Sequence, residues 1–274
     1  MKKKKLRKKT VVILLIIVIV FLLAQNLFIG WRFSYGPFKA LGDIRMAKLP
    51  GNSDEYAMSG VAPLENATLE GEKVLFLGSS VTYGEKSLRE SIPEYFAARM
   101  GWQITKEAVS GTTLADTGKN SYVQRLLNKV DPQEKYSLVI VQLSTNDAGK
   151  KQPLGDISEG FDPAGFDTKT TTGAIEFIIS YARQTWGCPV AFYTNARYES
   201  EAYGTLVQRL LELQEKWGIG VLNLWSDDGF NTIPDADRTL YLFDPIHPTK
   251  AGYREWWCPE LERQLCQWLA EVEI

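Results

Sequence analysis

His247 is the only histidine in this 274-residue chain. Asp244 lies three residues before it, at a spacing that lets a carboxylate orient an imidazole that moves a proton. Far upstream, Ser80 follows an apolar run and the turn-forming pair Gly78-Ser79. A serine hydroxyl becomes a good nucleophile only when a base takes its proton, so these three residue types would suit covalent catalysis at an acyl group.

The elements that must position these residues alternate between apolar β-rich runs and amphipathic helical stretches. The expected strands are 73–77, 103–109, 138–143, 190–194 and 220–224, and the expected helices are 91–100, 122–130, 171–186, 199–217 and a C-terminal pair flanking Pro259. Ser91 and Glu94 have the spacing of a capping box. The alternation predicts an α/β domain with a mainly parallel five-stranded sheet between two helical layers.

Four polar landmarks fall just beyond strand ends or on the last loop. They are Ser80, Ser110-Gly111, Ser144-Thr145-Asn146-Asp147, and Asp244 with His247. Because functional loops of a parallel sheet gather at the carboxyl ends of the strands, we expect these landmarks on one rim.

The four blocks resemble those of the SGNH hydrolase superfamily, also called GDSL esterases. The nucleophile block matches Gly78-Ser79-Ser80-Val81-Thr82, with Ser79 where many members have Asp. The other three blocks supply Gly111, Asn146, and Asp244 with His247; Ser144 stands where the third block usually has Gly.

The resemblance implies a three-layer, flavodoxin-like fold and an esterase activity without a cofactor or metal. It implies a triad of Ser80, Asp244 and His247, and an oxyanion hole made by the backbone N–H groups of Ser80 and Gly111 with the side-chain amide of Asn146. Losing one such donor costs about 3 kcal/mol in a typical hydrolase.

Each block taken alone also has a plain structural interpretation. Ser80 could cap a helix, Asn146 could form an Asx turn, and His247 could sit on a rigid exposed loop. Their order along the chain and the absence of a second histidine favour catalysis. Other enzyme classes fit poorly, because the sequence has no G-x-S-x-G elbow, no phosphate loop, and too few His and Cys residues at suitable spacing for a typical zinc site.

The amino terminus carries a strong membrane signal. Seven of the 31 Lys and Arg residues lie within residues 2–9, and the apolar stretch 11–29 follows, long enough as a helix to rise about 28 Å. Basic residues stay cytoplasmic, which places the rest of the chain outside. A cleaved signal peptide is the alternative, but no A-x-A site follows, so an uncleaved single-pass anchor in the cell membrane is favoured.

The chain therefore divides into a basic cytoplasmic tail (1–9), a transmembrane signal-anchor (10–31), a juxtamembrane stalk (32–71) and the catalytic domain (72–274). The chain beyond residue 9 has 24 basic and 33 acidic residues. Because it is acidic overall, a nucleic-acid partner is not expected. The three cysteines, Cys188, Cys258 and Cys266, do not form a disulfide framework. Either Cys188 is bridged to one of the other two or all three are free thiols.

Three groups of residues bear on substrate recognition. Residues 148–170 form a long polar insertion, interpreted either as a lid or substrate wall or as a surface excursion over a sheet edge. Four residues after the fourth strand are candidates to face the site: Tyr193, Asn195, Arg197 and Tyr198. Tryptophans could supply sugar-stacking platforms, although the helical spacing of Trp256, Trp257 and Trp268 favours the core.

Three functions are compatible with these features. The first is an exported esterase that hydrolyses carboxylic esters such as O-acyl groups on cell-surface glycans. The second is an acyltransferase that uses the same serine, and the third is a glycan-binding domain without catalysis. The third is disfavoured because every catalytic position is intact.

Overall fold

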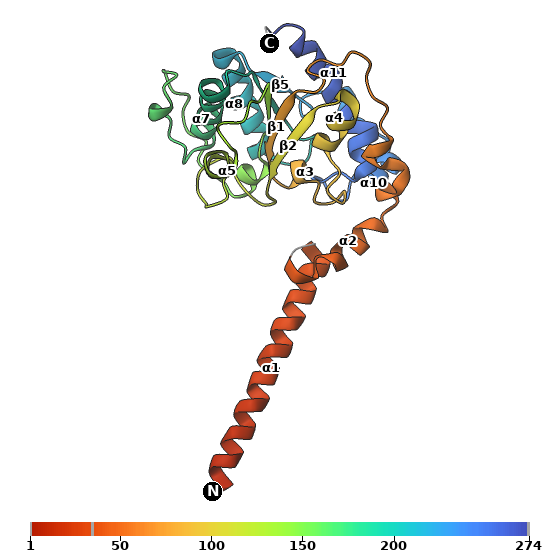
Figure 1. Cartoon of the computed structure of the whole chain (residues 1–274), viewed down its shortest axis with the longest axis vertical. Coiled ribbons are helices and arrows are strands. Elements are labelled where there is room, and N and C mark those ends of the chain that lie inside the picture. The colour runs from red at the N-terminus through yellow and green to blue at the C-terminus, as the bar shows by residue number, and fades with distance from the viewer. Residues whose placement is uncertain (1, 34–35, 273–274) are drawn as a thin grey trace. The chain divides into compact units, whose positions relative to one another are not determined.

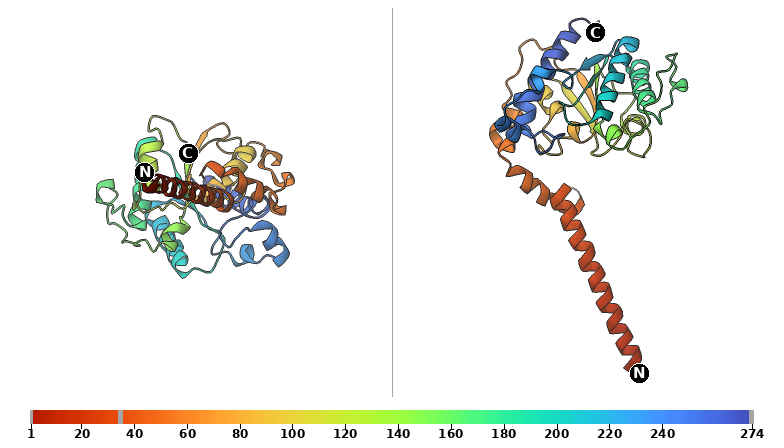
Figure 2. Two further views of the ribbon diagram at one scale, coloured as in Figure 1. Left: turned by 90° about the horizontal axis from the view of Figure 1, so that it is seen from below. Right: turned by 180° about the vertical axis from the view of Figure 1, so that it is seen from behind.

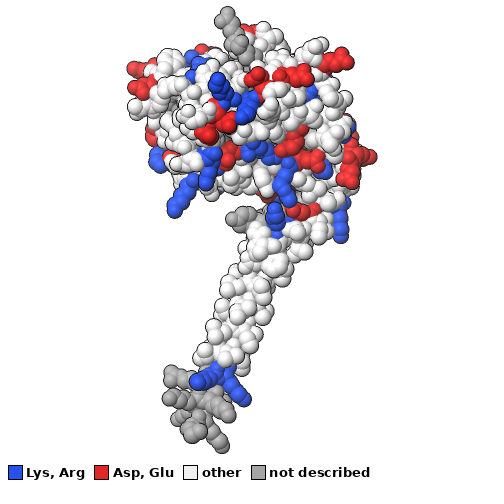
Figure 3. Space-filling view, in the orientation of Figure 1, with Lys and Arg blue, Asp and Glu red and all other residues white. Residues whose placement is uncertain are grey.

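The computed structural model describes residues 2–33 and 36–272, and the chain divides into two compact units, Met1–Pro50 and Gly51–Ile274. The first unit holds the long helix α1 (Lys2–Phe33), the short turn η1 (Gly36–Phe38) and helix α2 (Ala40–Ala47) (Figure 1). The segment Lys8–Arg32 of α1 is long and apolar enough to cross a membrane, as a signal sequence would also be. In Figure 3 the middle of α1 carries no charged side chain, and basic side chains lie at its amino-terminal end.

The second unit is built on one five-stranded sheet in the order β2-β1-β3-β4-β5, with every neighbouring pair parallel. The strands are β1 (Lys73–Gly78), β2 (Gln103–Ala108), β3 (Leu138–Gln142), β4 (Val190–Tyr193) and β5 (Gly220–Leu222). The predicted five-stranded parallel sheet is confirmed. The last strand stops two residues early because the Asn223 N–H donates to the Gln264 side chain at 2.6 Å instead of a neighbouring strand.

Helices cover both faces of this sheet, so the domain has three layers (Figures 1 and 2). Leu75 and Leu77 of β1 point into a core shared with α5 (Tyr122–Lys129), α7 (Thr171–Trp186) and α8 (Glu201–Trp217). Val74 and Phe76 point to the other face, which α4 (Ile92–Met100) and α11 (Cys258–Leu269) cover. The period-two alternation of a buried strand thus divides the apolar residues between two cores.

Local signals set several helix ends. The predicted capping box is present at the start of α4, where Ser91 and Glu94 bond each other's backbone. The prediction of two C-terminal helices that flank Pro259 is wrong, because Pro259 does not separate two helices. A π-helical segment, η6 (Gly252–Trp257), runs directly into α11, and Pro259 lies in the first turn of α11, where a missing N–H is tolerated.

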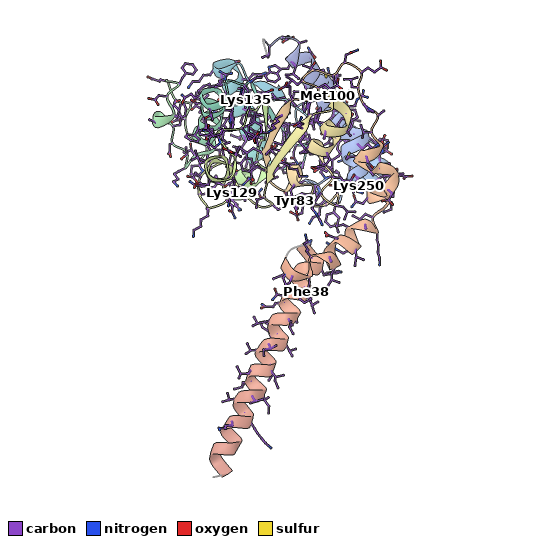
Figure 4. All side chains as sticks on the ribbon, viewed as in Figure 1. Phe38, Tyr83, Met100, Lys129, Lys135 and Lys250 are labelled. Atoms are coloured by element: carbon purple, nitrogen blue, oxygen red, sulfur yellow. The ribbon has the colours of Figure 1, made fainter. Side chains whose placement is uncertain are left out.

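Short helices that the sequence did not predict lie mostly at the carboxyl ends of the strands. In the second unit they are α3 (Ser80–Tyr83), α6 (Thr145–Gly149), α9 (Asp228–Asn231) and α10 (Asp235–Tyr241). Figure 4 labels Tyr83 and Lys250 along this edge of the domain, and Met100 and Lys135, which precede strands, toward the opposite edge.

The division into tail, anchor, stalk and catalytic domain stays a prediction. Within the predicted stalk, residues 51–71 belong to the second compact unit and include the turns η2 (Pro50–Asn52), η3 (Asp54–Tyr56) and η4 (Met58–Gly60). The Asn52 side chain donates to the Lys86 carbonyl at 2.7 Å and accepts from the Lys250 N–H at 2.9 Å. These contacts tie the segment to loops near the carboxyl ends of the strands.

The insertion after β3 does not cover a sheet edge, and its interpretation as a lid or substrate wall stays a prediction. Lys216 of α8 donates to the Ser158 carbonyl at 2.6 Å, and the ring of Phe161 packs edge-on against Trp217 with centroids 4.8 Å apart. Residues 154–168, with the turn η5 (Pro163–Gly165), therefore pack on α7 and α8, while β2 and β5 form the sheet edges.

The three cysteines are free thiols, and burial raises the pKa of Cys188 to about 11. Trp256 and Trp257 are buried in the core beside α11, and Trp268 packs against that core, as their spacing predicts.

Candidate active site

Ser80 lies at the first position of α3, immediately after β1, and its side chain is almost buried. The chain turns sharply here, and a Cβ at Gly78 would collide with the Thr82 hydroxyl. Gly78 is therefore needed for the close approach of strand and helix. The turn holds the Ser80 hydroxyl at the carboxyl end of β1, an interior strand of the sheet.

Three side chains predicted to act together are joined by hydrogen bonds. The Ser80 Oγ lies 2.8 Å from His247 Nε2, and His247 Nδ1 lies 2.8 and 2.9 Å from the two carboxylate oxygens of Asp244. The structure thus brings together a hydroxyl, an imidazole and a carboxylate in the order that proton removal from the hydroxyl requires.

Asp244 is held by its own loop as well as by the histidine. Its Oδ1 accepts hydrogen bonds from the backbone N–H groups of Ile246 at 3.0 Å and His247 at 2.9 Å. Burial acts to raise the pKa of Asp244, but the His247 ring and these N–H donors outweigh it and keep the pKa below the ordinary value. The carboxylate therefore stays ionised while facing the imidazole.

Gly111 lies on the loop after β2 and Asn146 lies in α6, and the two segments meet beside the nucleophile turn. Gly111 has a φ of +77°, a left-handed conformation that favours glycine. The Asn146 amide nitrogen donates to the Thr112 carbonyl at 3.0 Å and to the Ser79 hydroxyl at 3.2 Å. Asn146 thus contacts both the residue after Gly111 and the residue before Ser80.

Ser144, the departure from the family pattern, has a local structural role. Its hydroxyl caps α6 by accepting from the Asn146 N–H at 3.2 Å, and it also donates to the Thr112 carbonyl at 3.3 Å. The serine therefore fixes the start of the helix that carries Asn146.

Two buried side chains that the sequence analysis missed hold the nucleophile turn. The Gln142 Oε1 accepts from the Ser79 N–H at 2.8 Å and from the Thr82 hydroxyl at 2.9 Å. Arg125, which is 2% exposed, donates to the Gly78 carbonyl at 2.7 Å and to the Thr112 hydroxyl at 3.2 Å. The available signal was an arginine on the apolar face of the helix 122–130.

Asp147 connects the second and third blocks. Its carboxylate accepts from the backbone N–H groups of Leu114 at 2.8 Å and Ala115 at 2.9 Å, and from the Thr171 hydroxyl at 3.0 Å. Burial raises the pKa of Asp147 against the effect of these donors. Asp147 is buried and both of its carboxylate oxygens already accept hydrogen bonds from the protein. Its role is therefore to support the loop that follows Gly111.

Charged residues also surround the mouth of the site. Burial acts to raise the pKa of Glu85, but its hydrogen bonds to Lys86 and Ser110 outweigh this effect and keep the pKa below the ordinary value. Lys150, from the start of the insertion, donates to the Gly111 carbonyl at 2.6 Å.

The four candidates at the end of β4 and after it divide into two groups. Tyr193 is fully buried and its hydroxyl lies 2.6 Å from the Thr82 hydroxyl, so it does not face substrate, which corrects the expectation. The Asn195 side chain donates to the Ile246 carbonyl at 3.0 Å and thereby supports the His247 loop. Arg197 and Tyr198 line a cavity of about 480 Å³.

The sheet order, the three layers and the serine, imidazole and carboxylate at one rim define the class of α/β serine hydrolases. Residues 76–255, well over half of the chain, match the model of the GDSL-like lipase/acylhydrolase family, and the chain belongs to this family. It is accordingly an ester-hydrolysing serine hydrolase of the SGNH superfamily. A comparison with curated protein sequences gives no significant match.

Solved structures share the fold at low sequence identity. A protein from Lactobacillus plantarum is 19% identical with a TM-score of 0.59, and the match covers 76% of this chain and 100% of that one. A Bacteroides ovatus protein named as a GDSL-like lipase is 16% identical with a TM-score of 0.51 over 74% and 100% of the two chains. A Desulfitobacterium hafniense protein assigned to the G-D-S-L family is 17% identical with a TM-score of 0.53 over 71% and 99%.

Asn146 offers a test of the predicted oxyanion hole. Asn146→Ala is expected to lower kcat by about 10²–10³ with little change in KM, because its amide would bond the oxyanion rather than the ground-state ester. Steady-state hydrolysis of p-nitrophenyl acetate measures both constants. Ser144→Ala serves as the control for a disturbed start of α6, and an effect of Asn146→Ala on KM alone would instead assign the residue to substrate binding.

Proposed function

We propose that Ser80, His247 and Asp244 form the catalytic triad of this esterase. The single observation that carries the proposal is the continuous chain of hydrogen bonds from the Ser80 hydroxyl through the His247 ring to the Asp244 carboxylate, with contacts of 2.8 Å at each step. His247 takes the proton of Ser80 as the hydroxyl oxygen attacks the ester carbonyl, and the ionised carboxylate stabilises the resulting imidazolium. The imidazolium then gives that proton to the departing alcohol.

The negative charge on the carbonyl oxygen needs donors in both tetrahedral intermediates. In our proposal these are the backbone N–H groups of Ser80 and Gly111 and the Asn146 amide. Support comes from the position of Asn146, which contacts Ser79 on one side and Thr112 on the other. Water completes the cycle when His247 activates it to hydrolyse the acyl-serine.

The proposed substrates are esters on glycans at the cell surface, with the chain anchored by its amino-terminal helix. The proposal rests on the apolar segment Lys8–Arg32 and on the basic residues before it. A glycan hydroxyl in place of water would turn the same acyl-serine into the intermediate of an acyltransferase.

Hydrolysis of p-nitrophenyl esters of increasing acyl length by the full-length protein in detergent tests the esterase function. We expect release of equal amounts of nitrophenol and free acid, with the preferred chain length giving the size of the acyl site. Ester that accumulates on an added sugar, in place of free acid, would assign the protein to transfer. No turnover of any ester by the folded protein would contradict the triad proposal.

The topology of the chain is a separate prediction. The full-length protein should resist extraction by high salt and be released by detergent, because an apolar helix of this length stays in the bilayer. Protease treatment of intact cells should remove the compact unit Gly51–Ile274 and leave a short protected amino-terminal fragment. A mature protein free in the medium, with its amino terminus near residues 25–32, would identify the helix as a cleaved signal peptide.

A further inference from the structure

A cavity of about 480 Å³ lies at the carboxyl ends of β4 and β5, outside the proposed triad. Its lining residues come from the loop after β4 and from the segment that holds α9 and α10: Arg197, Tyr198, Glu199, Asp228, Asn231, Thr232 and Arg238. None of them belongs to the four blocks that define the family.

This cavity begins close to the His247 loop. The Asn195 side chain bonds the carbonyl of Ile246, the residue directly before His247. Arg197 follows Asn195 by two residues, a span of about 7 Å at most. The loop that forms one wall of the cavity is thus tied to the loop that carries His247.

The proposed path of the proton indicates which part of an ester would lie in the cavity. The imidazolium gives its proton to the leaving alcohol, so the alcohol part of the substrate must lie on the His247 side. The carbonyl oxygen points the other way, toward Gly111 and Asn146. A ligand in the cavity would accordingly be the alcohol part of the ester.

The wall of the cavity is held in place by its own hydrogen bonds. Arg197 donates to Asp228 Oδ1 at 2.6 Å and to the Trp225 carbonyl at 3.0 Å. The Asn231 Oδ1 accepts from the Arg197 N–H at 2.7 Å, while its Nδ2 donates to the Leu224 carbonyl at 2.7 Å. The Tyr198 ring packs edge-on against Trp225 with centroids 5.3 Å apart. Binding would therefore need little ordering of the loop that carries Arg197 and Tyr198.

The charges of the lining residues select the ligand class. Two guanidinium groups balance two carboxylates, so the cavity favours neither an anion nor a cation. The side chains of Arg238 and Glu199 have no hydrogen-bond or ion-pair partner within residues 2–33 and 36–272, which leaves strong donors and acceptors available. A neutral ligand with many hydroxyl groups can accept hydrogen bonds from Arg238 and donate them to Glu199, whereas an alkyl chain can do neither.

We propose that this cavity binds the sugar to which the acyl group is attached, while the ester itself reaches Ser80. This inference rests on the proposed esterase function and names the alcohol part of its substrate as a glycosyl unit. Arg238 and Tyr198 are the specificity residues, the first as a hydrogen-bond donor to sugar hydroxyls and the second as an aromatic contact.

Two acetyl esters separate sugar recognition from the chemical step. Glucose pentaacetate presents a sugar and p-nitrophenyl acetate does not, and both are measured with the full-length protein in detergent. We expect Arg238→Ala and Tyr198→Leu to lower kcat/KM for glucose pentaacetate by about tenfold or more through KM, as expected for the loss of a charged hydrogen bond or a ring contact. Turnover of p-nitrophenyl acetate should stay within about twofold, because neither residue touches the triad.

Arg263→Ala is the matched control, because this exposed arginine of α11 pairs with Glu260 and does not line the cavity. It should change neither reaction. Equal losses on both esters in the cavity variants, or unchanged turnover of the sugar ester, would overturn the sugar subsite while leaving the esterase function intact.

A binding measurement covers the case in which the esterase function itself fails. Saturation-transfer NMR of cellobiose with the Ser80→Ala protein needs no turnover. Signals that Arg238→Ala abolishes in the same background, and Arg263→Ala keeps, would support the subsite independently. Absent signals in the Ser80→Ala protein, or signals that survive Arg238→Ala, would count against it.

Discussion

Replacing Ser80 by alanine is expected to lower kcat for p-nitrophenyl acetate by about 10⁴–10⁶, leaving the activity that binding and the oxyanion donors alone provide. The nearest hydroxyl cannot substitute, because Ser79 is fully buried and its Oγ lies 3.3 Å from Gln142 Oε1 and 3.2 Å from the Asn146 amide. A fluorophosphonate should label Ser80 and leave the alanine variant unlabelled.

The matched variant Ser79→Ala removes the neighbouring hydroxyl but keeps the nucleophile. It should retain the phosphonate label and most of the turnover, because the Ser79 N–H still donates to Gln142 at 2.8 Å. Circular dichroism and the midpoint of thermal unfolding establish that both variants fold. Label on Ser79, or full activity in Ser80→Ala, would refute the assignment of the nucleophile.

His247→Ala is expected to reduce kcat almost as far as Ser80→Ala, because the chain holds no second imidazole to take the proton. Asp244→Ala should cost one to two orders of magnitude less, about the difference found between base and orienting acid in other triads. Water can replace part of the orientation and charge stabilisation that the carboxylate provides, but it cannot replace the proton acceptor.

Stopped-flow and steady-state assays of the two variants give this ranking directly. Asp244→Asn separates charge from shape: its side-chain carbonyl can still accept from the N–H groups of Ile246 and His247, but the negative charge facing the ring is lost. An Asp244→Ala enzyme slower than His247→Ala would require a different assignment of roles.

The sheet and the helices that flank it could be predicted because their signals are local. Each strand is a short apolar run, and α7 begins and ends where predicted, at Thr171 and Trp186. The Thr170 hydroxyl caps its start, and Gly187, with a φ of +65°, ends it. Likewise, the order of the four blocks along the chain was enough to expect Ser80, Asn146 and His247 on one rim.

Features that depend on contacts between distant segments could not be read from the sequence. Arg125 lies 47 residues from Gly78, whose carbonyl it binds, and Gln142 lies 63 residues from Ser79. The insertion after β3 is polar by composition, yet Phe161 and Phe166 attach it to Trp217. Such pairings follow from the packing of whole layers, whereas sequence patterns report on neighbours within one or two helical turns.

The short helices after the strands illustrate the same limit. With only four residues, α3 and α9 are too short to show a helical period. In α3 the Gln142 side chain accepts from the Thr82 N–H at 3.3 Å. In α9 the Asp227 side chain accepts from the Phe230 N–H at 2.8 Å. A sequence-based reading finds the turn residues but not the helix, and so misses the cavity beside α9 and α10.

The buried Arg125 joins the carbonyl of Gly78 to the hydroxyl of Thr112, and Asp147 joins the Leu114 loop to α6 and α7. These two side chains link the nucleophile turn, the loop that follows Gly111 and α6. Loss of either side chain would loosen the segments that it joins. The free energy gained on binding an ester is thus not consumed in assembling the catalytic machinery. Selectivity in such a rigid frame must come from the shape and polarity of the peripheral walls, so new substrate preferences can be acquired there without disturbing the chemistry.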